Sequence, residues 1–190
     1  HTILRRQRQM CIRDRSHYED ALDRHYFKHA LKSLKGNNPA IKYLRDYVAM
    51  EIDHKNILNI LEASSIGINP DDFNSLLISG GKLLPTRSFS SIAAGGRSAM
   101  LDILRTSNRF DMAHFEALIS ESENSRSLDP IITWFKEREH KFMKKMSYLH
   151  PISALPIVYY VAMKVQEVND LRIIVRLSLI HISEPTRPSI

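Results

Sequence analysis

The stretch YVAMEIDHKNILNIL at residues 47–61 has a related copy, YVAMKVQEVNDLRII, at residues 160–174, and this pair is the strongest indication of the fold. Tyr-Val-Ala-Met and an asparagine recur in both. Each copy has an apolar row, with one asparagine in it, at steps of three and four residues, which is the spacing of one helix face. The rows are Ala49, Ile52, Asn56 and Ile60 in the first copy and Ala162, Val165, Asn169 and Ile173 in the second. The sequence therefore predicts a repeated helical unit.

Helical patterns fill most of the remaining chain. The sequence predicts helices at 18–35, 40–63, 86–94, 97–106, 111–120, 129–148 and 152–176, and a short helix that starts at NPDDF (69–73) and stops at SGG (79–81). Glycines at 36, 95 and 96 and the polar stretch ESENSRS at 121–127 separate these helices. No stretch alternates as a strand does, so we predict an all-α fold.

The halves of the chain share one plan, in which a long helix, a turn and a Tyr-Val-Ala-Met helix follow one another. We therefore predict two tandem helical-bundle lobes, at residues 17–106 and 107–176. No apolar run approaches the roughly 18 residues that a membrane-spanning helix needs.

The two ends of the chain resemble translated sequencing adapters. RRQRQMCIRDR at 5–15 and LSLIHISEPTR at 177–187 match, in frame, the translation of a transposase-type adapter. We expect residues 1–16 and 177–190 to be adapter-derived and leave them out of the fold prediction. Cys11, the only cysteine, lies in the first of these segments, so the remaining chain has no cysteine for a disulfide, a metal or a nucleophile.

A formal net charge of +6 and a pI near 9.5 favour a nucleic-acid-binding module as one interpretation. The first 15 residues carry five arginines and one aspartate, so the charge falls from +6 to +2 when they are left out. Most of the excess positive charge therefore depends on the N-terminal segment.

Two local patterns resemble binding motifs. Gly80, Gly81 and Lys82 could suggest a phosphate loop, but such a loop needs a preceding strand and a serine or threonine after the lysine, where Leu83 stands. His25 and His29 have the spacing of two metal ligands on one helix, yet no third ligand lies nearby in sequence. We expect surface or packing roles for both patterns.

The first copy of the repeat contains two carboxylates, Glu51 and Asp53. Residues two apart on a helix point about 200° apart, so the pair is not expected to converge as a general acid and base. We expect solvated or inter-helix charges instead.

Asn56 and Asn169 recur within apolar rows, and a buried amide must be hydrogen-bonded. We therefore expect each asparagine to tie its helix to a neighbouring turn or helix end.

Aromatic and methionine side chains occur at the start of the second copy of the repeat and on the long helix predicted before it. Two interpretations stay open for them, a partner-binding face and a part of the core. They are Trp134, Phe135, Tyr159, Tyr160 and Met163.

Four stretches carry a family resemblance: LDRHYFKHALKS at 22–33, YLRDYVAMEIDHKNILNIL at 43–61, LLISGGKLLP at 76–85 and PISALPIVYYVAMKVQEVNDLRIIVR at 151–176. They resemble the C subunit of the archaeal-type (A/V-type) rotary ATPase, whose eukaryotic relative is the d subunit of the vacuolar ATPase. The resemblance covers nearly all of 17–176 and corresponds to about the C-terminal half of the family.

Two family motifs can be placed on this sequence. The pattern E-x-D-x-x-N-(I/L) is matched by Glu51, Asp53, Asn56 and Ile57. The closing pattern K-E-x-E-x-x-N-L-R, followed by isoleucine, is matched by Lys164, Glu167, Leu171, Arg172, Ile173 and Ile174. Asn169 departs from it, because it stands one place before the family's usual asparagine. The family's closing Gly-Lys is also missing here.

The resemblance implies a non-catalytic subunit of the central stalk that links the membrane proteolipid ring to the ATP-hydrolysing or ATP-synthesising head. It implies a peripheral position at the cytoplasmic face of the membrane, with the ring and the stalk subunits as partners. It implies no cofactor, metal, nucleic acid or small-molecule ligand. Two alternatives remain open, a basic helical nucleic-acid-binding module and a helical enzyme with a metal at His25 and His29.

Overall fold

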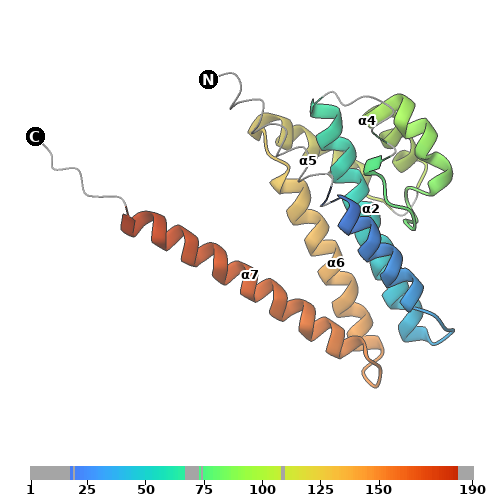
Figure 1. Ribbon diagram of the computed structural model, residues 1–190, viewed down its shortest axis with the longest axis vertical. Helices are drawn as coiled ribbons and strands as arrows, with labels where there is room; N and C mark the ends of the chain where they lie inside the picture. The colour runs from blue at the N-terminus through green and yellow to red at the C-terminus, as the bar shows by residue number, and fades with distance from the viewer. Residues whose placement is uncertain (1–17, 19, 67–72, 74, 108–109, 184–190) are drawn as a thin grey trace, which may run out of the picture. The chain divides into compact units, whose positions relative to one another are not determined.

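The computed structural model describes residues 18, 20–66, 73, 75–107 and 110–183, except for the side chains at 66 and 179–183. These residues form helices and connecting turns without a strand, which confirms the predicted all-α fold (Figure 1). The chain forms two compact units, His1–Phe142 and Met143–Ile190. The lobes that we predicted at 17–106 and 107–176 have other limits and stay a prediction.

The first unit begins with a helix over residues 20–33 and with α2, Pro39–Ile66. The predicted helices at 18–35 and 40–63 are thereby confirmed. Proline at the first position suits α2, because the missing N–H would have no partner there. The side chain of Asn38 accepts the N–H of Ala40 at 2.9 Å and so caps the helix start.

The described part of the next segment is hydrogen-bonded along α2 and leads into a kinked helix. The predicted helix start at 69–72 lies outside the described residues, whereas Phe73 and residues 75–76 are helical. A 3₁₀ turn, η1 (Thr86–Ser88), precedes α4 (Phe89–Arg105). Gly96 breaks α4 with φ 54° and ψ −135°. The predicted division of two helices at the glycine pair is therefore present as a kink.

The helix α5, Met112–Ser125, is longer than predicted. We expected a polar connection at 121–127, but polar residues such as Glu121 and Glu123 tolerate the exposed side of a helix. Arg126 ends α5 in the left-handed conformation, with φ 54°. The following helix α6, Asp129–Leu149, confirms the prediction for 129–148.

A large apolar core lies between α2, α4, α5 and α6. Its fully buried members include Ile57, Ile60, Leu84, Ile92, Met100, Leu104, Phe115 and Ile131. A smaller cluster, formed by Phe27, Val48, Ile52 and Ile78, fastens the helix over residues 20–33 to the other side of α2. Both apolar sides of α2 are therefore covered, as a helix at the centre of a bundle requires.

The second unit contains the end of α6, a turn, and α7, Leu155–Ser183, which is one continuous helix (Figure 1). The predicted helix at 152–176 is present, but α7 runs seven residues past the predicted end. We expected those residues to be adapter-derived and left them out of the fold prediction, although leucine and serine are compatible with a helix. The helix ends two residues before Pro185, and the residue preceding a proline disfavours the helical conformation.

Candidate functional site

A polar row along α2 holds the segment 76–84. The side chains of Asp53, Asn56 and Asn59 follow one another at steps of three residues, so they lie near one side of the helix. Each of them bonds to the backbone of that segment. We call residues 76–84 the strap.

Asp53 is 1% exposed and its carboxylate accepts three backbone N–H groups. The N–H groups of Lys82, Leu83 and Leu84 donate to it at 2.8, 2.9 and 3.0 Å. Burial raises the pKa of Asp53, while these three hydrogen bonds act in the opposite direction. The carboxylate thus occupies a small anion-binding loop formed by the protein's own backbone.

The conformation of this loop and its close approach to Asp53 require glycine at the two positions before Lys82. Gly80 has φ +119°, which other residues rarely adopt. A Cβ on Gly81 would lie 2.1 Å from Oδ1 of Asp53. The N–H groups at 82–84 that a phosphate would need are therefore already bonded to Asp53. In this structure the Gly-Gly-Lys sequence therefore binds the buried carboxylate of Asp53 through the backbone. The ammonium of Lys82 pairs with Asp46 at 2.6 Å.

Asn56 is fully buried and both ends of its amide are bonded to one residue of the strap. Nδ2 donates to the carbonyl of Ile78 at 2.8 Å, and Oδ1 accepts the N–H of Ile78 at 2.8 Å. Asn59 adds a bond to the carbonyl of Leu76 at 2.9 Å. The tie between a helix and a neighbouring turn that we expected of Asn56 is therefore present.

Glu51 and Asp53 do not converge, as expected from their spacing. Asp53 is a buried ligand of the strap, whereas we expected a solvated or an inter-helix charge. Glu51 instead hydrogen-bonds Tyr47, and Glu139 of α6 acts on it electrostatically. Burial, the largest cause, raises the pKa of Glu51 to about 7, Glu139 adds to the rise, and the bond from Tyr47 opposes it.

His54 was the nearest candidate for a third metal ligand beside His25 and His29, although it belongs to another helix. In the structure it instead makes the longest-range polar contact of this region. Its Nδ1 lies 2.5 Å from Oε1 of Glu139, 85 positions away, and its ring stacks on Phe135 with 4.1 Å between centroids. The side chain is 3% exposed. Only the packing of α6 on α2 brings these residues together, so spacing within α2 carries no signal of it.

The histidines that we weighed as metal ligands lie on the exposed part of their helix. The rings of His25 and His29 stack with 6.4 Å between centroids. Among the described residues, no group of three or more His, Cys, Asp or Glu side chains is placed to hold a metal ion.

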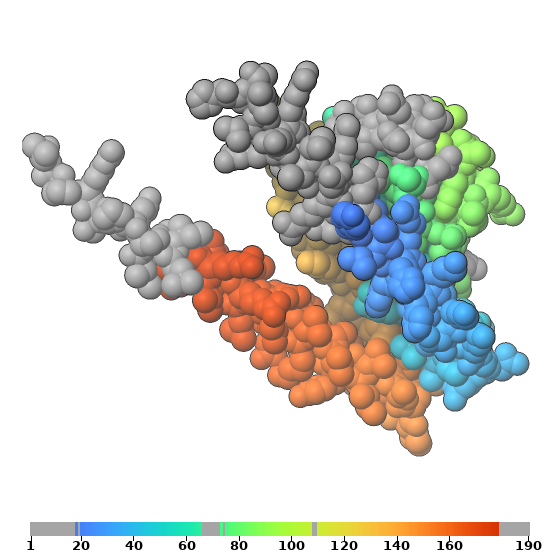
Figure 2. All heavy atoms as spheres, viewed as in Figure 1, coloured from blue at the N-terminus to red at the C-terminus, as the bar shows by residue number. Residues whose placement is uncertain are grey.

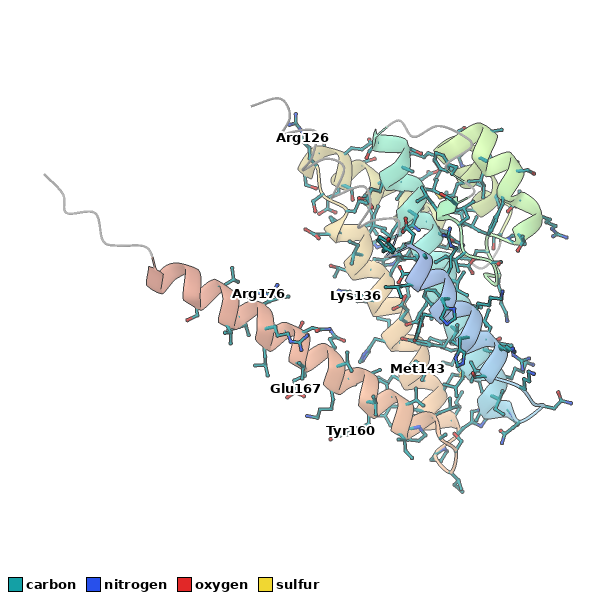
Figure 3. All side chains as sticks on the ribbon, in the orientation of Figure 1. Arg126, Lys136, Met143, Tyr160, Glu167 and Arg176 are labelled. Carbon is teal, nitrogen blue, oxygen red and sulfur yellow. The ribbon has the colours of Figure 1, made fainter. Side chains whose placement is uncertain are left out.

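The second copy of the repeat differs from the first, because residues 164–178 of α7 are all exposed, although the helix begins at the buried Leu155. Glu167, Asn169 and Arg172 are all exposed, and Glu167 pairs with Lys164 at 2.6 Å. Our expectation that Asn169 ties its helix to a neighbouring turn or helix end is wrong for this structure, because Asn169 is exposed and no described segment of its own unit covers that side of α7. Figure 3 labels Tyr160, Glu167 and Arg176 along this helix.

The large side chains that we assigned either to a partner-binding face or to the core do not share one environment. Phe135 is buried in the core of the first unit and Trp134 packs partly buried against it. Tyr160, in contrast, is 60% exposed on α7.

A sequence model of the ATP synthase (C/AC39) subunit family matches residues 3–180. The chain belongs to this family. The resemblance inferred from the four stretches above is thereby confirmed. The matched range includes most of the N-terminal segment that we expected to be adapter-derived, and nothing in the match supports that expectation.

Several relatives of this family member are each named as the C subunit of an A-type ATP synthase. The protein of Archaeoglobus fulgidus is 27% identical over 164 residues, which are 85% of this chain and 44% of the relative. That of Haloferax volcanii is 28% identical over 160 residues, 83% of this chain and 44% of the relative. That of Pyrococcus furiosus is 28% identical over 169 residues, 86% of this chain and 42% of the relative. No solved structure matches the chain.

The chain therefore spans less than half the length of these C/AC39 relatives. Within the described residues, no helix of this family member is both long and apolar enough to cross a membrane. In this chain the carboxylate of Asp53 accepts three backbone N–H groups of the strap, and the amide of Asn56 bonds the backbone of Ile78. That Glu51, Asp53, Asn56, Glu167, Asn169 and Arg172 are the family's motif positions stays a prediction.

Proposed function

We propose that the chain is part of a non-catalytic central-stalk subunit that couples a membrane proteolipid ring to the ATP-hydrolysing or ATP-synthesising head of an A/V-type ATPase. The observation that carries the proposal is the family match over residues 3–180. The curated relatives are themselves named as subunits of A-type ATP synthases.

The architecture of the first unit suits a part that transmits force. A rigid element must resist sliding between its helices, and the strap supplies specific bonds besides apolar packing. Asp53, Asn56 and Asn59 together hold it through six hydrogen bonds to backbone atoms of residues 76–84. Buried, fully paired polar groups of this kind favour one relative position of the elements that they join.

The exposed apolar side chains of α7 support a role in protein–protein contact. Figure 2 shows the helix in orange to red. Side chains more than half exposed include Val161, Val165, Leu171, Ile173, Ile174, Val175 and Leu177. Large apolar side chains exposed in this number along one helix are typical of a contact surface. We propose that α7 contributes to contacts within the ATPase, with the proteolipid ring and the central-stalk subunits as partners, at the cytoplasmic face of the membrane and peripheral to it.

Co-purification tests this proposal. The full-length protein that contains this chain is expected to be recovered with the proteolipid ring and the stalk subunits in mild detergent. Leu171→Asp on α7 is expected to weaken recovery at least about tenfold, because it places a charge in an apolar contact. Leu22→Asp is the matched control, since Leu22 is an exposed leucine on another helix, and it should leave recovery unchanged.

Two other outcomes would contradict the proposal. Absence of the ring and stalk subunits from the wild-type preparation would oppose the stalk assignment. Binding of duplex DNA or RNA by residues 17–176, with a steep dependence on salt, would favour the nucleic-acid-binding alternative.

We also propose that residues 1–16 and 177–190 derive from adapter DNA, and that the repeat marks lobes at 17–106 and 107–176. The first proposal rests on the resemblance of the two ends to adapter translations, although the family match extends over most of the N-terminal segment. Amplifying the gene from source DNA with primers outside both ends tests it.

Limited proteolysis tests the proposed lobes, since cleavage near residue 106 would support them and a first cut near residue 142 would contradict them.

A further inference from the structure

A row of titratable side chains on α2 faces α6 within the first unit. Tyr47, Glu51 and His54 are separated by four and three residues, so they lie on one face of α2. Glu139 of α6 meets this row, with its Oε1 2.5 Å from Nδ1 of His54. We call these four residues the α2–α6 cluster.

The cluster is largely shielded from water. His54 is 3% exposed and Glu139 20% exposed at their side chains. The His54 ring lies against Phe135, and its Nε2 is buried without a hydrogen-bond partner in the described structure. A buried charge is costly unless it is paired. The positions of protons in this cluster therefore affect how well α2 and α6 hold together.

The two side chains that shift the pKa of Glu51 are Tyr47 and Glu139, and neither of them is a cation. From the helix over residues 20–33, Tyr26 faces Glu51 and Tyr47. Two lysines of the surrounding elements are paired elsewhere, Lys55 with Asp23 at 2.9 Å and Lys82 with Asp46 at 2.6 Å. His54 is thus the one group of the cluster that can offset a carboxylate, and it already contacts Glu139.

We propose that the α2–α6 cluster is a proton-sensitive contact that is tight when Glu51 carries a proton and loosens when Glu51 ionises. A protonated Glu51 is a neutral partner for Tyr47 beside the pair formed by His54 and Glu139. Loss of that proton places a second carboxylate near Glu139 in a poorly hydrated site, where like charges repel strongly. This inference goes beyond the proposed function and does not depend on it.

The direction of the pH dependence follows from the protons bound by the folded and unfolded chain. Burial and the neighbouring Glu139 raise the pKa of Glu51 from 4.5 to about 7 in the folded state. Between these values the folded chain binds more protons, so its stability falls as the pH rises. The contribution of Glu51 is fully present below about pH 4.5 and is lost as the pH rises through about 7. Asp53 and Tyr47 also have raised pKa values, so a variant is needed to isolate Glu51.

The test combines a site-specific titration with unfolding of the full chain. Carbon-13 NMR of glutamate side-chain carboxyls should show Glu51 titrating near pH 7. In urea unfolding, the equilibrium constant of unfolding should rise roughly 70-fold more from pH 5 to pH 8 in the wild type than in Glu51→Gln, as the two pKa values of Glu51 require. Glu62→Gln is the matched control, because Glu62 is an exposed glutamate on the same helix, and it should keep the wild-type dependence.

A second variant distinguishes proton sensing from a merely structural contact. Glu139→Gln removes the neighbouring negative charge, so the titration of Glu51 should move to lower pH. This readout needs only the folded state and remains decisive if Glu51→Gln does not fold. A Glu51 that titrates near pH 4.5 in the wild type, or that titrates unchanged in Glu139→Gln, would overturn the proposal.

Discussion

At the scale of single residues, the two asparagines of the repeat show how burial determines the role of a side chain. Asn56 is fully buried and exchanges two hydrogen bonds with Ile78, whereas Asn169 is exposed on α7. Their sequence surroundings are similar, so the difference comes from what covers each helix. Asn56 is therefore expected to contribute to stability and Asn169 is not.

Replacing each asparagine by alanine tests this contrast. Asn56→Ala leaves the N–H and the carbonyl of Ile78 buried without partners, and we expect a loss of about 3 kcal/mol in the free energy of unfolding. Asn169→Ala, the repeat-matched control, should change it by less than about 0.5 kcal/mol. Urea unfolding measures both values. Equal effects of the two substitutions would contradict the role assigned to the strap tie.

At the scale of elements, the strap shows how a helix and a turn depend on each other. Asp53 needs backbone N–H groups to compensate its burial, and the turn needs glycine to bring those groups close enough. The carboxylate and the glycines lie about 30 positions apart in the chain and act as one unit. His54 and Glu139 likewise come together only because α6 packs on α2.

The end of α5 has a feature that can be tested separately. Arg126 is the only described residue other than glycine with a positive φ, at 54°, and it ends the helix in the conformation that glycine prefers. Arg126→Gly is expected to stabilise the chain by about 0.5–1 kcal/mol in thermal or urea unfolding, because glycine adopts this conformation without strain. Arg126→Ala keeps the strain and should be nearly neutral. A destabilising Arg126→Gly would show that the arginine side chain makes a stabilising contact of its own.

At the scale of the whole molecule, the two units bury their apolar residues to very different extents. The first unit has a continuous core between four helices, whereas α7 of the second unit exposes valine, leucine and isoleucine on several sides. A helix that is apolar on several sides is usually buried. The exposed surface of α7 therefore supports the contact role that we propose for this helix.

The isolated chain is accordingly expected to self-associate. Sedimentation velocity should show an average mass that rises with concentration, since α7 can bury its apolar surface against a second copy. The combined substitution of Val168, Leu171 and Val175 by glutamate should give a monomer at the same concentrations. A wild-type chain that stays monomeric throughout would contradict the assignment of α7 as a contact surface.

Much of the secondary structure could be predicted from the sequence, because helix periodicity and end signals act within a few residues. The row around Asn56, the proline at the start of α2 and the glycine break in α4 are of this kind. The extension of α5 to Ser125 was missed, since serine, asparagine and glutamate are compatible with either a helix or a connection. Family membership was also accessible from the four stretches that resemble the C subunit.

Local sequence patterns were enough to predict the helical repeat, the need of a buried asparagine for partners and the absence of a convergent Glu51–Asp53 pair. The packing of distant segments was needed to show that Asp53 binds the strap, that His54 contacts Glu139, and that Asn56 is buried while Asn169 is exposed. Helical spacing is a property of neighbouring residues, so it can be recognised locally. Burial and hydrogen-bond partners depend on segments 22 to 85 positions away, and the packing of those segments selects among residues that look equivalent in sequence.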